Sequence, residues 1–378
     1  MALGSKAVRS RLTQSEERWL RVRAYLRDHR HGLAVEAGGS YPDEAKVSGT
    51  PLLTVPSWHP ETPIPLDAIE LEYRPEADSA AVRGMEEAAW PLLPVRADGS
   101  RYRSYSEALA ELAAPDSFEN RSTYRSIQTD LTTTPHLVFG PGRYFDGIDV
   151  GEACAHEYAA TVLGEHDQPG LRALVGDPFD PARRPMNVAI SALTLRLDPA
   201  AGAATFPLHR RGRETVGHAG GLYQVLPVGV FQPASDEPWN TMNDFSLWRC
   251  MVREYAEELL GESEYRGAGE APIDYEGWPF ASRMTQALHR GTVRAYCFGL
   301  GVDPLTLATD LLVAAVFDAT IFDEFFGGLV VNNAEGSVLA AVPFEHAVVQ
   351  RLISEEPMQA AGAGLLALAW QHRRRLLG

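Results

Sequence analysis

The residues best suited to chemistry lie between Asp244 and Gly261, in the stretch DFSLWRCMVREYAEELLG. If this stretch is an α-helix, a step of about 100° per residue places Glu254, Glu257 and Glu258 together on one face. Like charges at this spacing repel one another by about 0.2–0.5 kcal/mol per pair. A divalent cation would reverse that repulsion, and Mg²⁺ binds to carboxylates, waters and phosphates. The pattern indicates either a magnesium site that handles phosphates or a solvated acidic face.

The same helix has an apolar side that would fix its position. Apolar side chains recur at helical spacing opposite the glutamates, at Trp248, Met251, Val252, Tyr255 and Leu259. A stripe of this kind packs against a core. We therefore expect the helix to be held by its apolar side, with the glutamates turned away from the core.

The segment around Arg253 resembles the signature helix of the Nudix hydrolases, whose pattern is G-x5-E-x7-REU-x-EE-x-GU, where U is bulky and apolar. The closing glycine is displaced by one position, to Gly261. The opening glycine corresponds to Gly229, which lies 24 positions before Arg253, about ten more than in the family. The first glutamate has no clear counterpart, although Asp236 or Glu237 could replace it. The positions that match are Arg253, Glu254, Tyr255, Glu257 and Glu258.

The resemblance implies a role for each matched side chain. Glu254, Glu257 and Glu258 would bind Mg²⁺ or Mn²⁺. Arg253 would pair with a glutamate and orient it, and the backbone carbonyl of Gly229 would complete the ligand set. In Nudix hydrolases such metal ions neutralise the pyrophosphate of a nucleoside diphosphate derivative and activate water. A nucleotide-type small molecule is therefore the expected substrate.

Residues outside the motif are candidates for further contacts. His218, in the loop Gly217–Gly221, either contacts the substrate or is exposed in a tight glycine turn. Trp239 lies in the insertion and could stack on a base, whereas Trp248 fits core packing better. A carboxylate from outside the helix often completes a Nudix site, and the candidates are Asp303, Asp310 and Glu335.

Charge and composition limit the classes of partner. The chain has 378 residues, 45% of them hydrophobic, which is typical of an ordered globular protein. Its net charge is −16, and Lys6 and Lys46 are its only lysines. Such an acidic chain repels a phosphate backbone, which argues against a nucleic-acid partner. Both a monomer and a homodimer remain open.

Targeting signals and cysteines favour the cytoplasm. The N-terminus lacks the apolar segment of a secretory signal. The longest apolar runs, near 311–317 and 360–370, are too short to cross a membrane. Widely spaced cysteines without a pairing framework or metal-ligand spacing fit buried thiols in a reducing compartment. They are Cys154, Cys250 and Cys297.

Residues 1–184 are expected to form an N-terminal α+β region. It begins with a helix over Thr13–His31, capped by Thr13 or Ser15, and continues into a Gly- and Pro-rich extended segment. Because no second helix follows closely, the first helix is better explained as a packing element than as a DNA reader. The segment Thr123–Leu131 is ambiguous. Further expected elements are a strand over Leu66–Tyr73, a helix over Ser104–Leu112, a strand over His136–Phe139 and a helix over Gly151–Leu163.

Residues 185–378 are expected to form a Nudix-like domain, an α/β/α sandwich with a mixed sheet. Its order of strands, a loop that leads into a helix, more strands and a closing helix is the order that such domains adopt. The predicted strands are Asn187–Leu197, Thr205–His209, Leu222–Phe231, Val293–Gly299, Thr306–Phe317 and Val338–Val342. The predicted helices, besides the acidic one, are Phe280–His289, Glu345–Ile353 and Met358–Leu377.

Longer stretches, among them GHAGGLYQVLPVGVFQP and VRAYCFGLGVDPLTLATDLL, resemble a group of large actinobacterial proteins often described as transcriptional regulators. The likeness extends from about Ala24 onward and implies that both regions belong to one unit. Three functions remain open: a metal-dependent Nudix-type hydrolase, a nucleotide-sensing or regulatory protein without turnover, and a structural protein whose acidic helix face is merely solvated.

Overall fold

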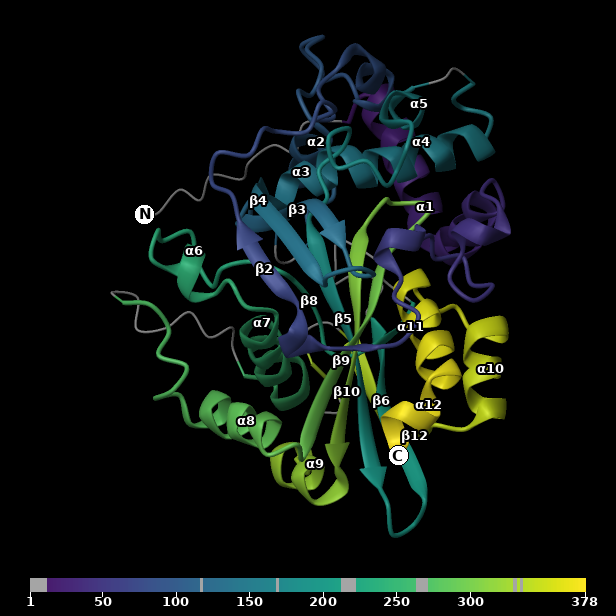
Figure 1. Cartoon of the computed structure of the whole chain (residues 1–378). Helices are drawn as coiled ribbons and strands as arrows, with labels where there is room; N and C mark the ends of the chain where they lie inside the picture. The colour runs from purple at the N-terminus through teal and green to yellow at the C-terminus, as the bar shows by residue number, and fades with distance from the viewer. Residues whose placement is uncertain are drawn as a thin grey trace, which may run out of the picture.

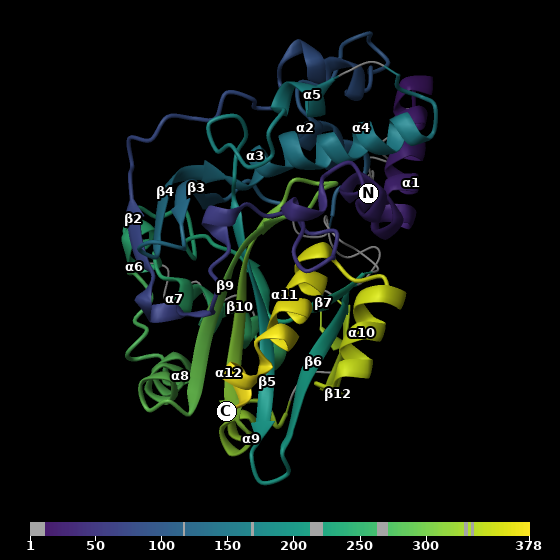
Figure 2. The same cartoon turned by 45° about the vertical axis from the view of Figure 1, so that its right-hand side comes forward.

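A large mixed sheet runs through the middle of the molecule, with helices on both of its faces (Figure 1, Figure 2). The structure is a computed structural model that describes residues 12–115, 118–167, 170–211, 222–262, 271–328, 332–333 and 336–378. The N-terminal region covers one end of the sheet. The predicted fold class, α/β with a mixed sheet and an N-terminal α+β extension, is confirmed.

The large sheet contains strands from both regions of the chain. They are β1 (Ile64–Pro65), β5 (Val188–Asp198), β6 (Ala203–Arg211), β7 (Tyr223–Val225), β8 (Val228–Val230), β9 (Val293–Val302), β10 (Thr309–Asp318), β11 (Asn332–Asn333) and β12 (Gly336–Pro343). Their order is β1-β9-β10-β5-β6-β12-β11, with β7 beside β6 and β8 beside β5. β5 and β10 run parallel and are almost wholly buried, as expected for central strands covered on both faces.

The predicted strand Leu222–Phe231 is wrong in one respect, because it is two short strands with different neighbours. β7 pairs with β6, and β8 pairs with β5. Pro227 lies between them and has no N–H to donate to a ladder. Its carbonyl instead accepts a hydrogen bond from Ala192 N–H (2.9 Å). The break places Gly229 directly opposite Ile190 on β5.

Four helical segments cover one face of the sheet. They are α7 (Leu247–Glu254), the π-helical segment η6 (Tyr255–Leu259), α8 (Pro279–His289) and α9 (Ala319–Phe326). A short helix, α6 (Asn240–Asn243), precedes α7, so the predicted helix from Asp244 begins later than expected. The prediction also missed α9, although its buried residues Phe322, Phe325 and Phe326 have helical spacing.

The opposite face carries α10 (His346–Glu355), α11 (Ala360–Gln371) and α12 (Arg373–Leu377). The predicted helix Met358–Leu377 is therefore interrupted, at His372. α11 is buried on nearly all sides and rich in Ala and Gly, which allows close approach. A Cβ on Gly364, for example, would lie 2.6 Å from Leu52 Cδ2 of the N-terminal region.

The N-terminal region begins with α1 (Gln14–Gly38), which extends beyond the predicted end at His31. The predicted cap at Thr13 is confirmed. Glu16 N–H donates to Thr13 Oγ1 (3.1 Å), and Thr13 N–H donates to Glu16 Oε2 (2.7 Å). Other helical elements are η1 (Asp43–Ala45), η2 (Pro56–Trp58), η3 (Leu66–Ala68), η4 (Glu87–Leu92), α2 (Tyr105–Leu112), α3 (Tyr144–Gly147), the π-helical η5 (Ile148–Glu152), α4 (Ala153–Val162) and α5 (Leu171–Val175).

A second, three-stranded sheet lies in the same region, in the order β2-β4-β3. Its strands are β2 (Glu70–Tyr73), β3 (Ser122–Asp130) and β4 (His136–Arg143). The ambiguous segment Thr123–Leu131 is thus a strand, whereas the first part of the predicted strand Leu66–Tyr73 is the 3₁₀ turn η3.

The N-terminal region is joined to the large sheet by backbone hydrogen bonds. β1 pairs with the outer edge of β9. Further along that edge, Leu53 and Val302 exchange two hydrogen bonds of 2.9 and 2.8 Å. The neighbouring Leu52 is fully buried between β9 and α11, since a Cβ on Gly301 or Gly364 would meet its side chain. The largest hydrophobic core accordingly contains residues from both regions.

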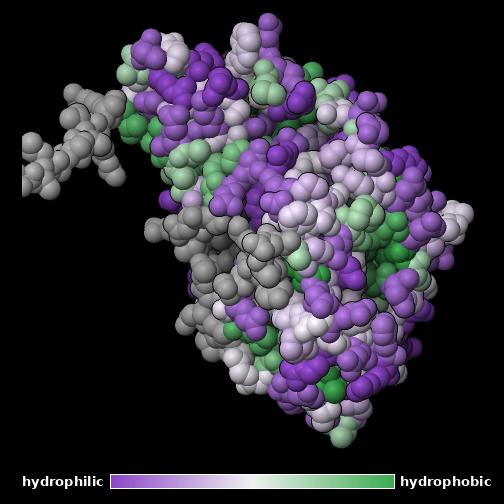
Figure 3. All heavy atoms as spheres, turned by 90° about the vertical axis from the view of Figure 1, so that its left-hand side faces the viewer, coloured by the Kyte–Doolittle hydropathy of each residue, from purple (hydrophilic) through white to green (hydrophobic). Residues whose placement is uncertain are grey.

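One face of the molecule is mostly hydrophilic and the cysteines are buried, as the amino-acid composition and the apolar surroundings of the cysteines predict. On the face shown in Figure 3, hydrophilic residues predominate and hydrophobic residues form small separate groups. Within the described ranges, the helices are all too short or too polar to span a membrane. All three cysteines are buried with free thiols, and burial raises the pKa of each thiol to about 12.

Candidate functional site

Packing fixes the rotation of the acidic helix against the sheet. Ser246 caps α7, since its Oγ accepts a hydrogen bond from Arg249 N–H (3.3 Å). Cys250 and Met251 are buried beneath the helix. In η6 the buried Tyr255 hydroxyl lies 2.9 Å from the hydroxyl of Thr194 on β5. These contacts turn the glutamates of the helix toward the neighbouring strand β8.

The helix changes its winding at the glutamates. It is α-helical through Glu254 and π-helical from Tyr255 to Leu259, so each residue there advances by a smaller angle than in an α-helix. As a result, the three carboxylates do not share one open face. Glu258 is only 4% exposed, and Glu254 and Glu257 are half-buried. The prediction that all three glutamates lie on one solvent-exposed face is therefore wrong, because Glu258 is buried.

Two of the carboxylates meet consecutive residues of β8. Val228 N–H donates to Glu258 Oε1 (3.0 Å). The Glu254 carboxylate lies so close to Gly229 that a Cβ at this position would overlap it. Any larger side chain at 229 would therefore displace the Glu254 carboxylate. The glycine that the sequence motif singled out and the first glutamate of its helix are in direct contact.

Arg253 lies beneath the same contact and is 6% exposed. Its Nη2 donates to the carbonyl of Gln232 (2.5 Å), just after β8. Burial by itself lowers the pKa of Arg253, but the neighbouring Cys250, Tyr275, Asp244 and Glu254 raise it above the ordinary value. The guanidinium therefore stays charged, holds the segment after β8 and interacts electrostatically with Glu254.

The donor set at β8 does not form a closed metal site. Among the described residues, no group of three or more His, Cys, Asp or Glu side chains is arranged to hold a metal ion. Mg²⁺, however, keeps several waters and binds through one or two carboxylates together with substrate phosphates. The contact of the Glu254 carboxylate with Gly229 is compatible with an ion held in that partial way and not with a preformed protein cage.

The other predicted site residues fall in different surroundings. Trp239 is 42% exposed at the start of α6. Asp236 accepts a hydrogen bond from Ser122 N–H (2.8 Å) and pairs with Arg143 (2.7 Å). Asp303 Oδ1 accepts hydrogen bonds from its own turn, including Thr306 N–H (2.8 Å). His218 and Glu335 lie outside the described residues.

Asp310 lies on the face of the sheet opposite to the acidic helix. It is paired in register with Ala189, which in turn is paired with Val230. Side chains of paired residues point to the same face, and neighbours along a strand alternate. Asp310 and Val230 therefore face α11, while Gly229 faces Glu254. Ser191 Oγ donates to Asp310 Oδ1 (2.8 Å) on that side.

A cavity of about 200 Å³ lies at this end of the sheet and was not predicted from the sequence. Its walls come from η5, the segment before β5, β8, the start of β10 and the residue before α11. The polar and charged residues in its walls are Tyr144, Glu152, Arg184, Asn187, Thr306, Thr309, Asp310 and Gln359. The sequence signal that could have indicated it is Arg184, a charged residue next to a strongly apolar strand.

No protein-family model matches the chain, and no curated protein sequence matches it. Among solved structures, the chain is similar to a NUDIX hydrolase from Alicyclobacillus acidocaldarius, with 16% sequence identity and a TM-score of 0.28. That similarity covers 49% of this chain and 91% of the other.

Proposed function

We propose that this protein is a divalent-metal-dependent hydrolase of the Nudix type that cleaves a pyrophosphate bond in a nucleotide derivative. The observation that carries the proposal is the contact between Glu254 and Gly229. The sequence motif assigns these two residues to one site although they are 25 positions apart, and the Glu254 carboxylate occupies the space over Gly229. The hydrogen bond from Val228 N–H to Glu258 (3.0 Å) supports the same arrangement.

In this proposal, Glu254 and Glu257 bind Mg²⁺ or Mn²⁺. The expected ligation by the carbonyl of Gly229 is not retained, because the register turns this carbonyl toward Ile190 of β5. Glu258 completes the acidic set and ties the helix to β8. When bound, the ion supplies charge neutralisation of the pyrophosphate and activation of water. Arg253 keeps the glutamates in place through the backbone after β8.

Substrate contacts are assigned to His218 and Trp239, which flank β7 and β8 in the sequence. An exposed indole can stack on a nucleobase. The buried free thiols favour a reducing compartment, the cytoplasm, as the place of action.

A second candidate is a protein that binds a nucleotide without cleaving it. It is favoured by the burial of Glu258 and by the dispersed arrangement of acidic side chains within the described residues, which brings no three of them around one point. A hydrolytic site uses its metal to activate water, whereas binding alone requires only phosphate neutralisation.

The two candidates are separated by one assay on the full chain. The purified protein is incubated with nucleotide sugars, dinucleotides, NAD-like compounds and nucleoside triphosphates in Mg²⁺ or Mn²⁺, and products are identified by mass spectrometry. The hydrolase proposal expects metal-dependent loss of one substrate class, abolished by Glu257→Gln. The matched control is Glu262→Gln, which removes the same charge from an exposed position just after the helix.

The possible outcomes distinguish the two candidates. Turnover by the wild type and by Glu262→Gln, but not by Glu257→Gln, supports the hydrolase. No turnover combined with a nucleotide-induced rise in melting temperature favours the binding protein. Equal turnover in all three proteins would place the activity outside the acidic helix and contradict both proposals.

A further inference from the structure

The cavity at the end of the sheet has walls that are mostly apolar. Ile148, Val150, Val228, Val230 and Leu307 are among its lining residues. Its volume of about 200 Å³ exceeds the ~150 Å³ that accommodates benzene in an engineered protein cavity. It is smaller than the roughly 300–1,000 Å³ typical of sites for drug-sized ligands. The space therefore fits a compact molecule with one ring or a short chain, and not a whole nucleotide.

Arg184 gives this apolar cavity a positive charge. It is 2% exposed, and within the described ranges no carboxylate forms an ion pair with it. Its hydrogen bonds go to the carbonyls of Pro178 (2.6 Å) and Pro185 (3.3 Å) and to Thr309 Oγ1 (3.0 Å). They leave one N–H on each terminal nitrogen for a further acceptor, and a bond from a guanidinium to an oxyanion is strengthened by charge.

A buried arginine held by carbonyls is not by itself a site, as Arg125 shows. Arg125 is 4% exposed and donates to the carbonyls of Asp78 (2.5 Å) and Pro141 (3.3 Å). It does not line the cavity. Arg184 differs because it borders an open space. Burial lowers its pKa to about 10, although the nearby Cys154, Tyr41 and Asp177 act in the opposite direction.

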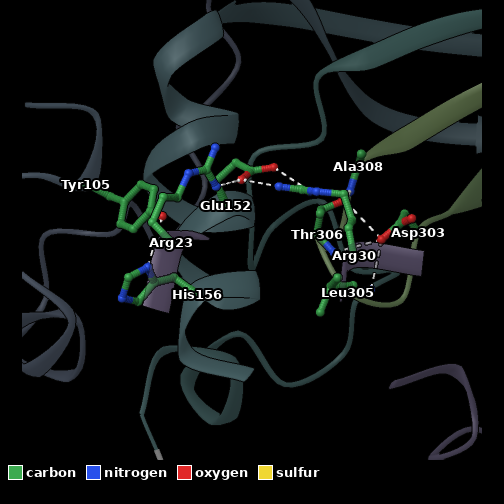
Figure 4. A network of polar contacts seen from close by, with 9 residues as sticks. All are labelled: Arg23, Arg30, Tyr105, Glu152, His156, Asp303, Leu305, Thr306 and Ala308. Carbon is green, nitrogen blue, oxygen red and sulfur yellow. Dashed lines mark hydrogen bonds and ion pairs between the residues drawn. The ribbon is translucent and has the colours of Figure 1, made fainter. Parts of the chain in front are cut away.

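Further charged groups surround the cavity. Glu152 lines the cavity and is paired with both Arg23 and Arg30. Figure 4 shows the two guanidinium groups reaching this one carboxylate from opposite sides. Arg184 thus borders the cavity without a direct ion pair, while Asp310 supplies a carboxylate elsewhere in the same wall. Buried charges are expensive unless they are paired.

We propose that this cavity binds a small organic anion, whose carboxylate or phosphate group pairs with Arg184 and whose apolar body fills the space beside Val230. Asp310, on the wall of the cavity, accepts a hydrogen bond from Ser191 (2.8 Å). A hydroxyl or amino group on the ligand would donate to the same carboxylate. The ligand is thus an anion at one end with a hydrogen-bond donor at the other.

This site is separate from the acidic helix. Val230 and Asp310 point to the face of the sheet that carries α11, whereas Gly229 points to Glu254 on the other face. The inference therefore does not rest on the proposed hydrolase. Glu257→Gln, which disables the proposed hydrolase, should leave binding in the cavity unchanged.

The test measures melting temperature and calorimetric affinity of the full chain with benzoate, phenyl phosphate, 4-hydroxybenzoate, benzyl alcohol and benzylamine. The carboxylates and the phosphate distinguish the two possible anionic groups, and the last two compounds control for charge. We expect an anion to raise the melting temperature by a few degrees. The hydroxyl of 4-hydroxybenzoate should strengthen binding over benzoate, and benzylamine should have no effect.

Substitutions in and outside the cavity test whether the anion binds at Arg184. Arg184→Met should weaken binding of the anion by at least about 30-fold, and the matched Arg125→Met should leave it unchanged. Because Arg184→Met also loses structural hydrogen bonds, Ala308→Leu provides an independent test that fills the cavity while it retains Arg184. No stabilisation of the wild type by any anion would overturn the proposal. Equal affinity of the wild type and Ala308→Leu would overturn it as well.

Discussion

β8 separates two regions of opposite character. On one side, the acidic helix brings the carboxylates of Glu254 and Glu258 against the strand. On the other side, Arg184 and apolar residues surround a cavity that Val228, Gly229 and Val230 also line. Under the two proposals, one face of this three-residue strand binds a cation and the other face binds an anion.

The two regions also differ in how far apart in the sequence their residues lie. The acidic contact is made within about 30 consecutive residues, by a strand and the helix that follows it. The cavity combines five segments of the chain, from Tyr144 to Gln359. A local motif can be recognised in the sequence, whereas a cavity made of distant segments exists only once the whole chain has folded.

The largest expected effect on stability is at Glu152, which lines the cavity and pairs with two buried arginines. Glu152→Gln leaves Arg23 and Arg30 buried without their counter-charge, and we expect a loss of about 3–5 kcal/mol in the free energy of unfolding. The measurement is urea denaturation. The control is Glu165→Gln, which removes a more exposed ion pair with Arg18 (2.7 Å) and should cost less than about 1 kcal/mol. Equal losses in both variants would show that the buried network has no special role.

Asp149, in the same helical segment as Glu152, should make stability depend on pH. Burial raises the pKa of its carboxyl from the ordinary 3.8 to about 6, although Ser106 N–H donates to it (2.6 Å). A carboxyl with a raised folded pKa stabilises the fold while it is protonated. Its contribution is complete below about pH 4 and is lost as the pH rises through 6.

Asp149→Asn removes this dependence. Between pH 4 and pH 7 the free energy of unfolding of the wild type should fall relative to the variant by up to about 3 kcal/mol. Denaturation curves at several pH values test this. Parallel pH profiles of the two proteins would mean that Asp149 titrates normally.

An intermediate effect is expected at the acidic contact. In Gly229→Ala the new methyl group takes the space of the Glu254 carboxylate. We expect the proposed metal-dependent turnover to fall by about 10–100-fold, with a stability change under about 1 kcal/mol, since the displaced group is the end of a flexible side chain. Steady-state kinetics with varied Mn²⁺ measures this. Gly32→Ala, where a Cβ meets nothing within 4 Å, is the control with unchanged kinetics.

The smallest effect on stability is expected at Trp239. Because its side chain is 42% exposed, Trp239→Ala should change the free energy of unfolding by no more than about 0.5 kcal/mol. If it stacks on a base, nucleotide affinity should fall by about 1–3 kcal/mol in calorimetry. Trp90→Ala, at a position 50% exposed in the N-terminal region, serves as control. Equal nucleotide affinity in both variants would remove Trp239 from the site.

Much of the fold could be predicted because its signals are local. The apolar run Asn187–Leu197 is β5 within one residue at each end, and the caps at Thr13 and Ser104 begin α1 and α2. The predictions were wrong where one local sequence pattern is compatible with two different structures. Pro227 divides one predicted strand, and η6 changes the winding of a helix without any single residue that marks it.

The candidate site was predictable to a lesser degree. The sequence motif identified Gly229 and Glu254, which the structure places in contact. It could not reveal that Glu258 is buried against Val228, because that depends on the π-helical winding and on the pairing of β8 with β5. Arg184 and Asp310 are 126 positions apart, so only the parallel pairing of β5 and β10 brings them to one cavity.

The attachment of the N-terminal region to β9 has a consequence for the order of synthesis. Leu53 and β1 cover the outer edge of β9, and Leu52 packs between β9 and α11. During translation these residues emerge long before β9 and α11 exist. At about 5–20 residues per second, the second half of the chain takes about 10–40 s to follow. The early segment therefore makes its final contacts only after β9 and α11 have been synthesised.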